Sequence, residues 1–201
     1  MIAVTSRDLC REPLPVRVGR IASAGPELIV LREKDLPHDA LLDLAAECLA
    51  MCSGHGVVLS VNSAVDVAEE LGTGAVHLPM DVLRDTDVSG FDLVGASVHS
   101  TAEAVEAEAL GADYLIAGHV FATSCKSTEP RGTGFLSEVC GSVGIPVYAI
   151  GGISPDKVDR VISAGAAGVC AMSSLMATDD PEGLVRALSR DMFAPRTRVR
   201  N

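Results

Sequence analysis

Residues 147–174 read VYAIGGISPDKVDRVISAGAAGVCAMSS and contain one complete strand–helix–strand unit. The apolar run Val147–Ile150 predicts a buried strand, and the pair Gly151–Gly152 predicts a turn directly after it. Ser154–Pro155 is typical of a helix start, with Ser at the cap and Pro in the first turn. A second apolar run, Val169–Met172, predicts the next strand. Because a helix crosses between the two strands, we expect them to lie parallel in one sheet.

The same unit repeats along the chain. Each apolar run is almost continuous, which is typical of parallel strands covered on both faces. Eight strand–helix units in 201 residues average about 25 residues each, and this economy predicts a compact (β/α)8 barrel, or TIM barrel. An open doubly wound sheet is the alternative, although no G-x-G-x-x-G follows the first strand. The predicted strands are Ile2–Thr5, Glu27–Leu31, Val57–Val61, Ala75–Leu78, Leu93–Ser97, Tyr114–Ala117, Val147–Ile150 and Val169–Met172.

Nothing in the sequence divides this series of units into separate domains. No linker or low-complexity tract interrupts it, so we expect one barrel domain over residues 1–195 and an Arg-rich tail at residues 196–201. Between strands, the segment Thr101–Leu110 (TAEAVEAEAL) predicts a helix with Thr101 at its cap and its end at Gly111.

The composition and charge of the chain disfavour some classes of binding partner. Aromatic residues make up 3% of the chain and Trp is absent, so few rings are available to stack on bases. Sixteen basic and 27 acidic residues give a net charge of −11, which disfavours nucleic-acid binding. No apolar run reaches about 18 residues, and the first residues lack the features of a signal peptide. We therefore expect a cytoplasmic protein with no nucleic-acid or membrane partner.

The sequence gives little sign of a metal site. The six cysteines include no C-x-x-C pair and no His at zinc spacing, which predicts unpaired thiols in a reducing compartment. Cys125 beside Lys126 could be a nucleophile, but the sequence shows no general base for it and no further residue that would orient such a base. Glu33 and Asp81 follow predicted strands and could hold Mg²⁺, although two carboxylates on separate loops are weak evidence. We expect no metal and no cofactor.

Polar, basic and glycine residues follow nearly every predicted strand, where a barrel of this kind places its chemistry. Gly151–Gly152 and Ser173–Ser174 follow the seventh and eighth strands, the recurrent phosphate position of this fold, and would offer backbone N–H groups and hydroxyls. The alternative is that the two glycines only form a tight turn. The other rim residues include Arg32, Lys34, Asn62 and Ser97.

The segment after the sixth strand, GHVFATSCKSTEPRGTG at residues 118–134, is the longest predicted loop, and long loops in compact domains are usually functional. It carries Lys126 and Arg131, which would attract an anionic ligand. Its glycines Gly132 and Gly134 could let it close over that ligand.

His119 lies at the base of this loop, immediately beyond the sixth strand. An imidazole titrates near neutrality, so at the mouth of a barrel it can both remove and return a proton. The alternative is a structural histidine bonded to a backbone carbonyl, the interpretation that we favour for His38, His55 and His77.

Eight short motifs follow one another along the chain: LREKD at 31–35, Asn62, VHL at 76–78, G-x-S-x-H at 95–99, GADY at 111–114, VFATSCK at 120–126, AIGGI at 149–153 and MSS at 172–174. Together they resemble the thiamine phosphate synthase superfamily over about residues 1–190. The combination of SVHS with GHVFATSCK followed by RG is similar to its thiazole tautomerase, or TenI-like, branch. Val30, Ser63 and Val82 stand where synthases of the superfamily carry a pyrimidine-contacting Gln and two Asp ligands of Mg²⁺, and His119 stands where they carry Pro.

The resemblance implies an isomerase of thiamin biosynthesis that aromatises a carboxythiazole phosphate tautomer, with His119 as the acid–base shuttle. It also implies a homodimer. A thiamine phosphate synthase, a catalytically silent regulatory protein that binds the same phosphate, and another phosphosugar isomerase or epimerase are the alternatives. The residues implied to bind substrate or phosphate are Arg32, Lys34, Asn62, Ser97, Lys126, Gly151, Gly152, Met172 and Ser173.

Overall fold

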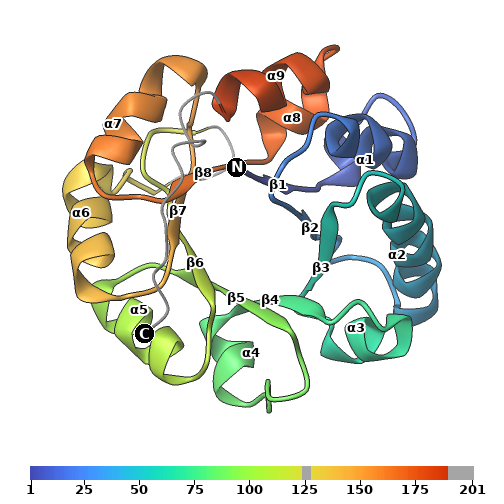
Figure 1. The fold of residues 1–201 in the computed structure, drawn as a ribbon, viewed down its shortest axis with the longest axis horizontal. Coiled ribbons are helices and arrows are strands. Elements are labelled where there is room, and N and C mark those ends of the chain that lie inside the picture. Colours follow the sequence, from blue (N-terminus) through green and yellow to red (C-terminus); the bar gives the residue numbers. More distant parts are fainter. Residues whose placement is uncertain (124–127, 190–201) are drawn as a thin grey trace.

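The computed structural model describes residues 1–123 and 128–189, and these form a closed eight-stranded parallel barrel inside a ring of helices (Figure 1). Strands pair in chain order and β8 closes on β1, which confirms the predicted (β/α)8 architecture. The arginines of the predicted tail lie outside the described residues. The strands are β1 (Ile2–Val4), β2 (Leu28–Leu31), β3 (Val58–Asn62), β4 (Ala75–Pro79), β5 (Leu93–Val98), β6 (Tyr114–Gly118), β7 (Val147–Ile150) and β8 (Gly168–Ala171).

Helices follow the strands and cover the outside of the barrel (Figure 1). No helix among the described residues is both long enough and apolar enough to span a membrane. The helices are α1 (Leu14–Ser23), α2 (His38–Ser53), α3 (Val65–Leu71), α4 (Met80–Arg84), α5 (Thr101–Ala109), α6 (Gly132–Ser142), α7 (Val158–Ser163), α8 (Ser173–Ala177) and α9 (Pro181–Leu188), with 3-10 turns η1 (Arg7–Leu9) and η2 (Pro155–Lys157).

The N-terminus of α5 differs from the prediction by one residue. The cap is Ser100, whose hydroxyl accepts the backbone N–H of Glu103 at 3.1 Å, and Thr101 is already inside the helix. The Glu103 carboxylate in turn accepts the backbone N–H of His99 at 2.5 Å. This reciprocal arrangement satisfies two donors at the helix start, which a cap at Thr101 would leave to water.

Two apolar layers hold the fold together. The outer layer lies between strands and helices and is built almost entirely from aliphatic side chains. The inner layer fills the barrel, where Tyr114 and Tyr148 pack edge-on with ring centroids 6.1 Å apart. The inner layer also carries His77, a fully buried polar side chain. The apolar filling ends below the carboxyl ends of the strands, and this leaves room there for a cavity.

Candidate active site

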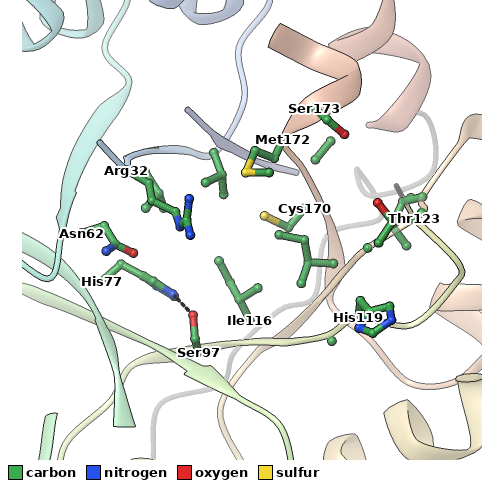
Figure 2. A pocket seen from close by; sticks show the side chains of 18 of the residues that line it. Arg32, Asn62, His77, Ser97, Ile116, His119, Thr123, Cys170, Met172 and Ser173 are labelled. Atoms are coloured by element: carbon green, nitrogen blue, oxygen red, sulfur yellow. Dashed lines mark hydrogen bonds between the residues drawn. The ribbon is translucent and has the colours of Figure 1, made fainter. Parts of the chain in front are cut away.

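A cavity of about 700 Å³ opens at the carboxyl ends of the strands, which is a typical volume for a small-molecule site. All eight strands or the segments that follow them contribute to its lining. Figure 2 shows its two sides. Arg32, Asn62, His77 and Ser97 lie on one side, His119 and Thr123 lie on the other, and Ile116 and Cys170 lie between them.

The structure brings together nine of the ten site residues that we predicted. Lys126 lies outside the described residues, as does Cys125, the candidate nucleophile. Arg131 lies within them but does not line the cavity, because its guanidinium packs 5.1 Å from the ring centroid of Phe135. The nine residues that line the cavity are Arg32, Lys34, Asn62, Ser97, His119, Gly151, Gly152, Met172 and Ser173.

The cavity is cationic. Arg32, Lys34 and Lys157 line it, and no Asp or Glu side chain does so within residues 1–123 and 128–189. None of these three cations forms an ion pair with a described carboxylate, whereas the exposed Arg84 is paired with Glu106 at 2.7 Å. The lining therefore offers positive charge to an anion.

The two carboxylates considered for Mg²⁺ lie elsewhere. Glu33 is buried behind the rim, where it accepts the Thr5 hydroxyl at 2.7 Å and the Arg7 backbone N–H at 3.1 Å. Asp81 is exposed on α4 and does not line the cavity. Because Mg²⁺ prefers carboxylate ligands, the described lining does not fit a Mg²⁺ site, and the suggestion that Glu33 and Asp81 form one is wrong.

His119 is held by hydrogen bonds to the backbone on both sides. Its Nε2 lies 3.0 Å from the carbonyl oxygen of Thr128, and because a carbonyl can only accept, Nε2 carries the proton. The lone pair of the neutral ring is therefore on Nδ1. The Arg131 backbone N–H donates to the His119 carbonyl at 3.0 Å, and His99 Nδ1 lies 2.8 Å from the Gly118 carbonyl. These contacts hold the backbone around His119 in place and define the tautomer of its ring.

The two glycines after β7 are needed because the segment after β6 packs directly against them. A Cβ on Gly151 would lie 2.2 Å from the His119 Cβ, and one on Gly152 would lie 2.2 Å from the Ala122 carbonyl oxygen. Both residues also have positive φ, 99° and 63°. Their role is thus more than a tight turn, since this close approach sets the position of His119 beside the predicted phosphate site.

The loop after β6 is shorter than predicted. It ends at Arg131, because Gly132 begins α6 and Gly134 lies inside that helix. The Gly132 backbone N–H donates to the Val120 carbonyl at 3.0 Å, which ties the end of the loop to its beginning. Gly132, with a φ of 78°, therefore stands where the loop meets α6, and that the two glycines let the loop close over a ligand stays a prediction.

Lys157 is a cavity residue that sequence reasoning missed. It ends the 3-10 turn η2, where its ammonium donates to the Gly152 carbonyl at 2.7 Å and lies 5.1 Å from the ring centroid of Phe121. These contacts hold a positive charge at the β7 side of the cavity, next to Gly151. The signal in the sequence was its place three residues after Ser154, in the first turn of the segment that follows the glycines.

His77 also lines the cavity, contrary to its interpretation as an ordinary structural histidine. Its Nε2 lies 2.8 Å from Ser97 Oγ and its Nδ1 lies 3.1 Å from the Tyr114 hydroxyl. Burial lowers the pKa of His77 to about 3, so the ring is neutral at physiological pH. Its neighbours in VHL are apolar, and that pattern gave no sign of a polar role.

The Lys157→Met variant is expected to bind phosphorylated ligands about 10-fold more weakly, because a hydrogen bond from a charged donor to an anion is lost. Titration calorimetry with inorganic phosphate measures this change. Arg160→Met is the matched control, since Arg160 also lies 5.1 Å from the Phe121 ring centroid but does not line the cavity. If both variants lost the same affinity for phosphate, the loss would come from the contact with the Phe121 ring and not from the Lys157 charge in the cavity.

Comparison with known proteins identifies the family of the chain. Residues 1–175 match the TMP-TENI family, described as thiamine monophosphate synthase. The chain is 38% identical over 195 residues to a putative thiamine-phosphate synthase of Geobacter sulfurreducens, covering 94% of this chain and 90% of that protein. It is 37% identical to a thiamine-phosphate synthase of Methanoculleus marisnigri, covering 96% and 95%.

Among solved structures, a thiamine phosphate pyrophosphorylase from Pyrococcus furiosus superposes with a TM-score of 0.82 at 30% identity, covering 93% of this chain and 92% of that one. The similarity thus extends over the whole barrel and includes every strand that contributes to the cavity. The chain belongs to the TMP-TENI family of thiamine-biosynthesis enzymes.

Proposed function

We propose that the protein is a thiazole tautomerase, which converts a carboxythiazole phosphate tautomer into its aromatic form. The observation that carries this proposal is the pairing of His119, with its lone pair on Nδ1, and a cavity whose described lining holds cations but no carboxylate. A proton transfer needs a base at a fixed position. Departure of a diphosphate needs a metal to neutralise its charge, and the described residues offer little to hold one.

The cavity fits a planar ligand with one anionic group at each end. We assign the phosphate to the β7 and β8 side, where Gly151, Gly152, Met172 and Ser173 follow the strands and Lys157 adds a charge. The ligand carboxylate would lie toward the opposite side. Arg32, Lys34 and Asn62 line that side, and Lys126, outside the described residues, is proposed for the same end.

The ring would lie between these ends, over Ile116 and Cys170. Both side chains are buried and line the cavity, and burial raises the pKa of the Cys170 thiol, so it presents a neutral surface. A neutral, apolar floor suits one face of a thiazole ring. It also excludes water from the region through which the proton moves.

The reaction needs only one group that accepts and returns a proton. His119 Nδ1 removes the proton from ring C2, and the electron pair of the broken C–H bond enters the ring. The exocyclic double bond shifts into the ring, and its outer carbon takes the proton back from the imidazolium. No atom is gained or lost, so no cofactor enters the balance. Both carbons lie on one planar ligand, which lets a single imidazole serve both steps.

The test follows the thiazole tautomer by NMR in the presence of the purified protein. Conversion to the aromatic product is expected without added metal and at an unchanged rate with excess EDTA. Binding of the carboxythiazole phosphate without conversion would contradict this proposal and would indicate a regulatory binding protein.

A thiamine phosphate synthase is the second candidate, and the names of the relatives favour it. A synthase would couple the thiazole phosphate to a pyrimidine diphosphate and would require Mg²⁺. We expect no thiamin phosphate in this assay. Mg²⁺-dependent formation of thiamin phosphate, with no tautomer conversion, would replace our proposal with this one.

A further inference from the structure

Two buried side chains and one half-buried side chain form a hydrogen-bonded chain that ends at the cavity wall. Tyr114 on β6, His77 on β4 and Ser97 on β5 follow one another, with the Tyr114 hydroxyl 3.1 Å from His77 Nδ1 and Ser97 Oγ 2.8 Å from His77 Nε2. Figure 2 shows the second of these contacts, at the edge of the cavity. Tyr114 and His77 are only 5% and 2% exposed, and of the three residues His77 and Ser97 line the cavity, whereas Tyr114 does not.

Gly95 makes room for this chain. In the strand register Gly95 lies opposite both His77 of β4 and Tyr114 of β6, so the three residues occupy one level of the barrel. A Cβ on Gly95 would lie 2.1 Å from Tyr114 Cζ and 2.5 Å from His77 Nδ1. The hydrogen bond therefore fills the space that a side chain at position 95 would take, which accounts for the glycine of the G-x-S-x-H motif.

The hydrogen bonds of the Tyr114–His77–Ser97 chain all donate in one direction. Neutral His77 carries one proton on its ring, and Tyr114 has a second polar neighbour, Ser60. Burial raises the pKa of Tyr114 and a hydrogen bond with Ser60 lowers it, which is the effect of a Ser60 hydroxyl that donates to the phenol oxygen. The phenol proton is then directed at His77 Nδ1, which must supply the lone pair. The ring proton is therefore on Nε2, and it is donated to Ser97 Oγ. Ser97 accepts on this side, so its own proton is available to the cavity.

We propose that His77, oriented by Tyr114, is a positioning residue that fixes Ser97 as a hydrogen-bond donor facing the ligand. The occupant of the cavity must then present an acceptor at this wall, and a ring nitrogen or a carboxylate oxygen meets that requirement. Neighbouring Arg32 can likewise only donate. The identity of the acceptor rests on the proposed function, but the direction of the chain does not.

This wall would thus select against ligands that carry a donor in the same place. A ligand N–H or O–H directed at Ser97 would meet the Ser97 hydroxyl proton. Reversing the hydrogen-bonded chain would turn the Tyr114 phenol proton toward Ser60 and would leave the buried Ser60 hydroxyl without an acceptor among the described residues. A buried donor without an acceptor disfavours binding. Through this hydrogen-bonded chain, Tyr114 would influence which ligands the cavity binds, although Tyr114 does not line the cavity.

The first experiment compares Tyr114→Phe with Tyr148→Phe. Tyr148 is a matched control, because it belongs to the same inner cluster but its hydroxyl donates to Glu27, away from the cavity. With the aromatic carboxythiazole phosphate as probe, Tyr114→Phe is expected to weaken binding about 10-fold, and Tyr148→Phe is expected to leave it unchanged. In a Ser97→Ala background, Tyr114→Phe should cause no further loss.

Equal losses in the two phenylalanine variants would overturn the proposal, since both would then reflect packing alone. A loss that persisted at full size in the Ser97→Ala background would do the same, because the effect would not pass through Ser97. Thermal unfolding of each variant shows whether its barrel is intact when binding is measured.

The second experiment uses no ligand. Nitrogen-15 NMR of labelled histidine reports which ring nitrogen of His77 carries the proton, and we expect Nε2 in the unmodified protein and a mixture of tautomers in Tyr114→Phe. A proton on Nδ1 in the unmodified protein would refute the proposed direction. If the probe did not bind the unmodified protein at all, the proposed function would fail, and this measurement would still decide the direction of the chain.

Discussion

The His119→Ala variant is expected to convert the thiazole tautomer about 10²- to 10⁴-fold more slowly than the unmodified protein, while binding of the aromatic product is largely retained. The reason is that the lone pair of Nδ1 is removed, whereas the glycine and lysine contacts on the β7 side remain. Turnover followed by NMR, together with product affinity from calorimetry, separates the two quantities. Unchanged turnover would remove His119 from the chemistry.

A purely structural role of His119 is tested by His119→Gln. The glutamine amide can still donate to the Thr128 carbonyl, as Nε2 does now, but it offers no base. We therefore expect the glutamine variant to be as slow as the alanine variant, and added imidazole to restore part of the rate in the smaller one. Recovery of activity in His119→Gln would favour the structural role. His55→Ala, at an exposed histidine that does not line the cavity, serves as the unaffected control.

The Gly152→Ala variant is expected to lose about 3 kcal/mol or more of unfolding free energy, together with most of its affinity for phosphorylated ligands. Two costs combine here. The residue has a φ of 63°, which an L side chain rarely adopts, and its new Cβ would lie 2.2 Å from a backbone oxygen that cannot rotate away. Because that oxygen belongs to Ala122, relief of the clash would separate the β6 and β7 segments.

Chemical denaturation and calorimetry with inorganic phosphate measure both effects. Gly72→Ala is the control for the first cost alone, since Gly72 has a φ of 67° but a Cβ added there would meet nothing within 4 Å. We expect about 1 kcal/mol of destabilisation there and no change in phosphate affinity. If Gly152→Ala were no worse than this control, the close packing of the two segments would not be what positions the phosphate site.

Much of the fold was predictable because parallel strands covered on both faces leave a continuous apolar signal. The runs at Val147–Ile150 and Leu93–Val98 were visible for this reason, and the eightfold repeat then limited the architecture. Boundaries were less predictable. The cap of α5 depends on whether the hydroxyl of Ser100 or Thr101 reaches a particular N–H, and two adjacent hydroxyl residues give the same local signal.

The candidate site was predictable where residues end or directly follow strands, as Asn62 ends β3 and His119 follows β6. Lys157 and His77 were missed because their roles depend on contacts between segments distant in sequence. Lys157 turns back to the Gly152 carbonyl from a later turn, and His77 meets Tyr114 across a glycine of the intervening strand. Such contacts depend on register and close packing, which a single sequence does not display.

We expect the charge distribution of the barrel to select ligands by size. Four surface arginines are each paired with a carboxylate and are therefore largely neutralised as anion sites: Arg7, Arg11, Arg20 and Arg84. Within the described residues, unpaired cations line a cavity of about 700 Å³. We expect that space to admit a compact phosphorylated molecule and to exclude a polymer of phosphates. The net charge of −11 would then repel larger polyanions without preventing small anions from reaching the cavity.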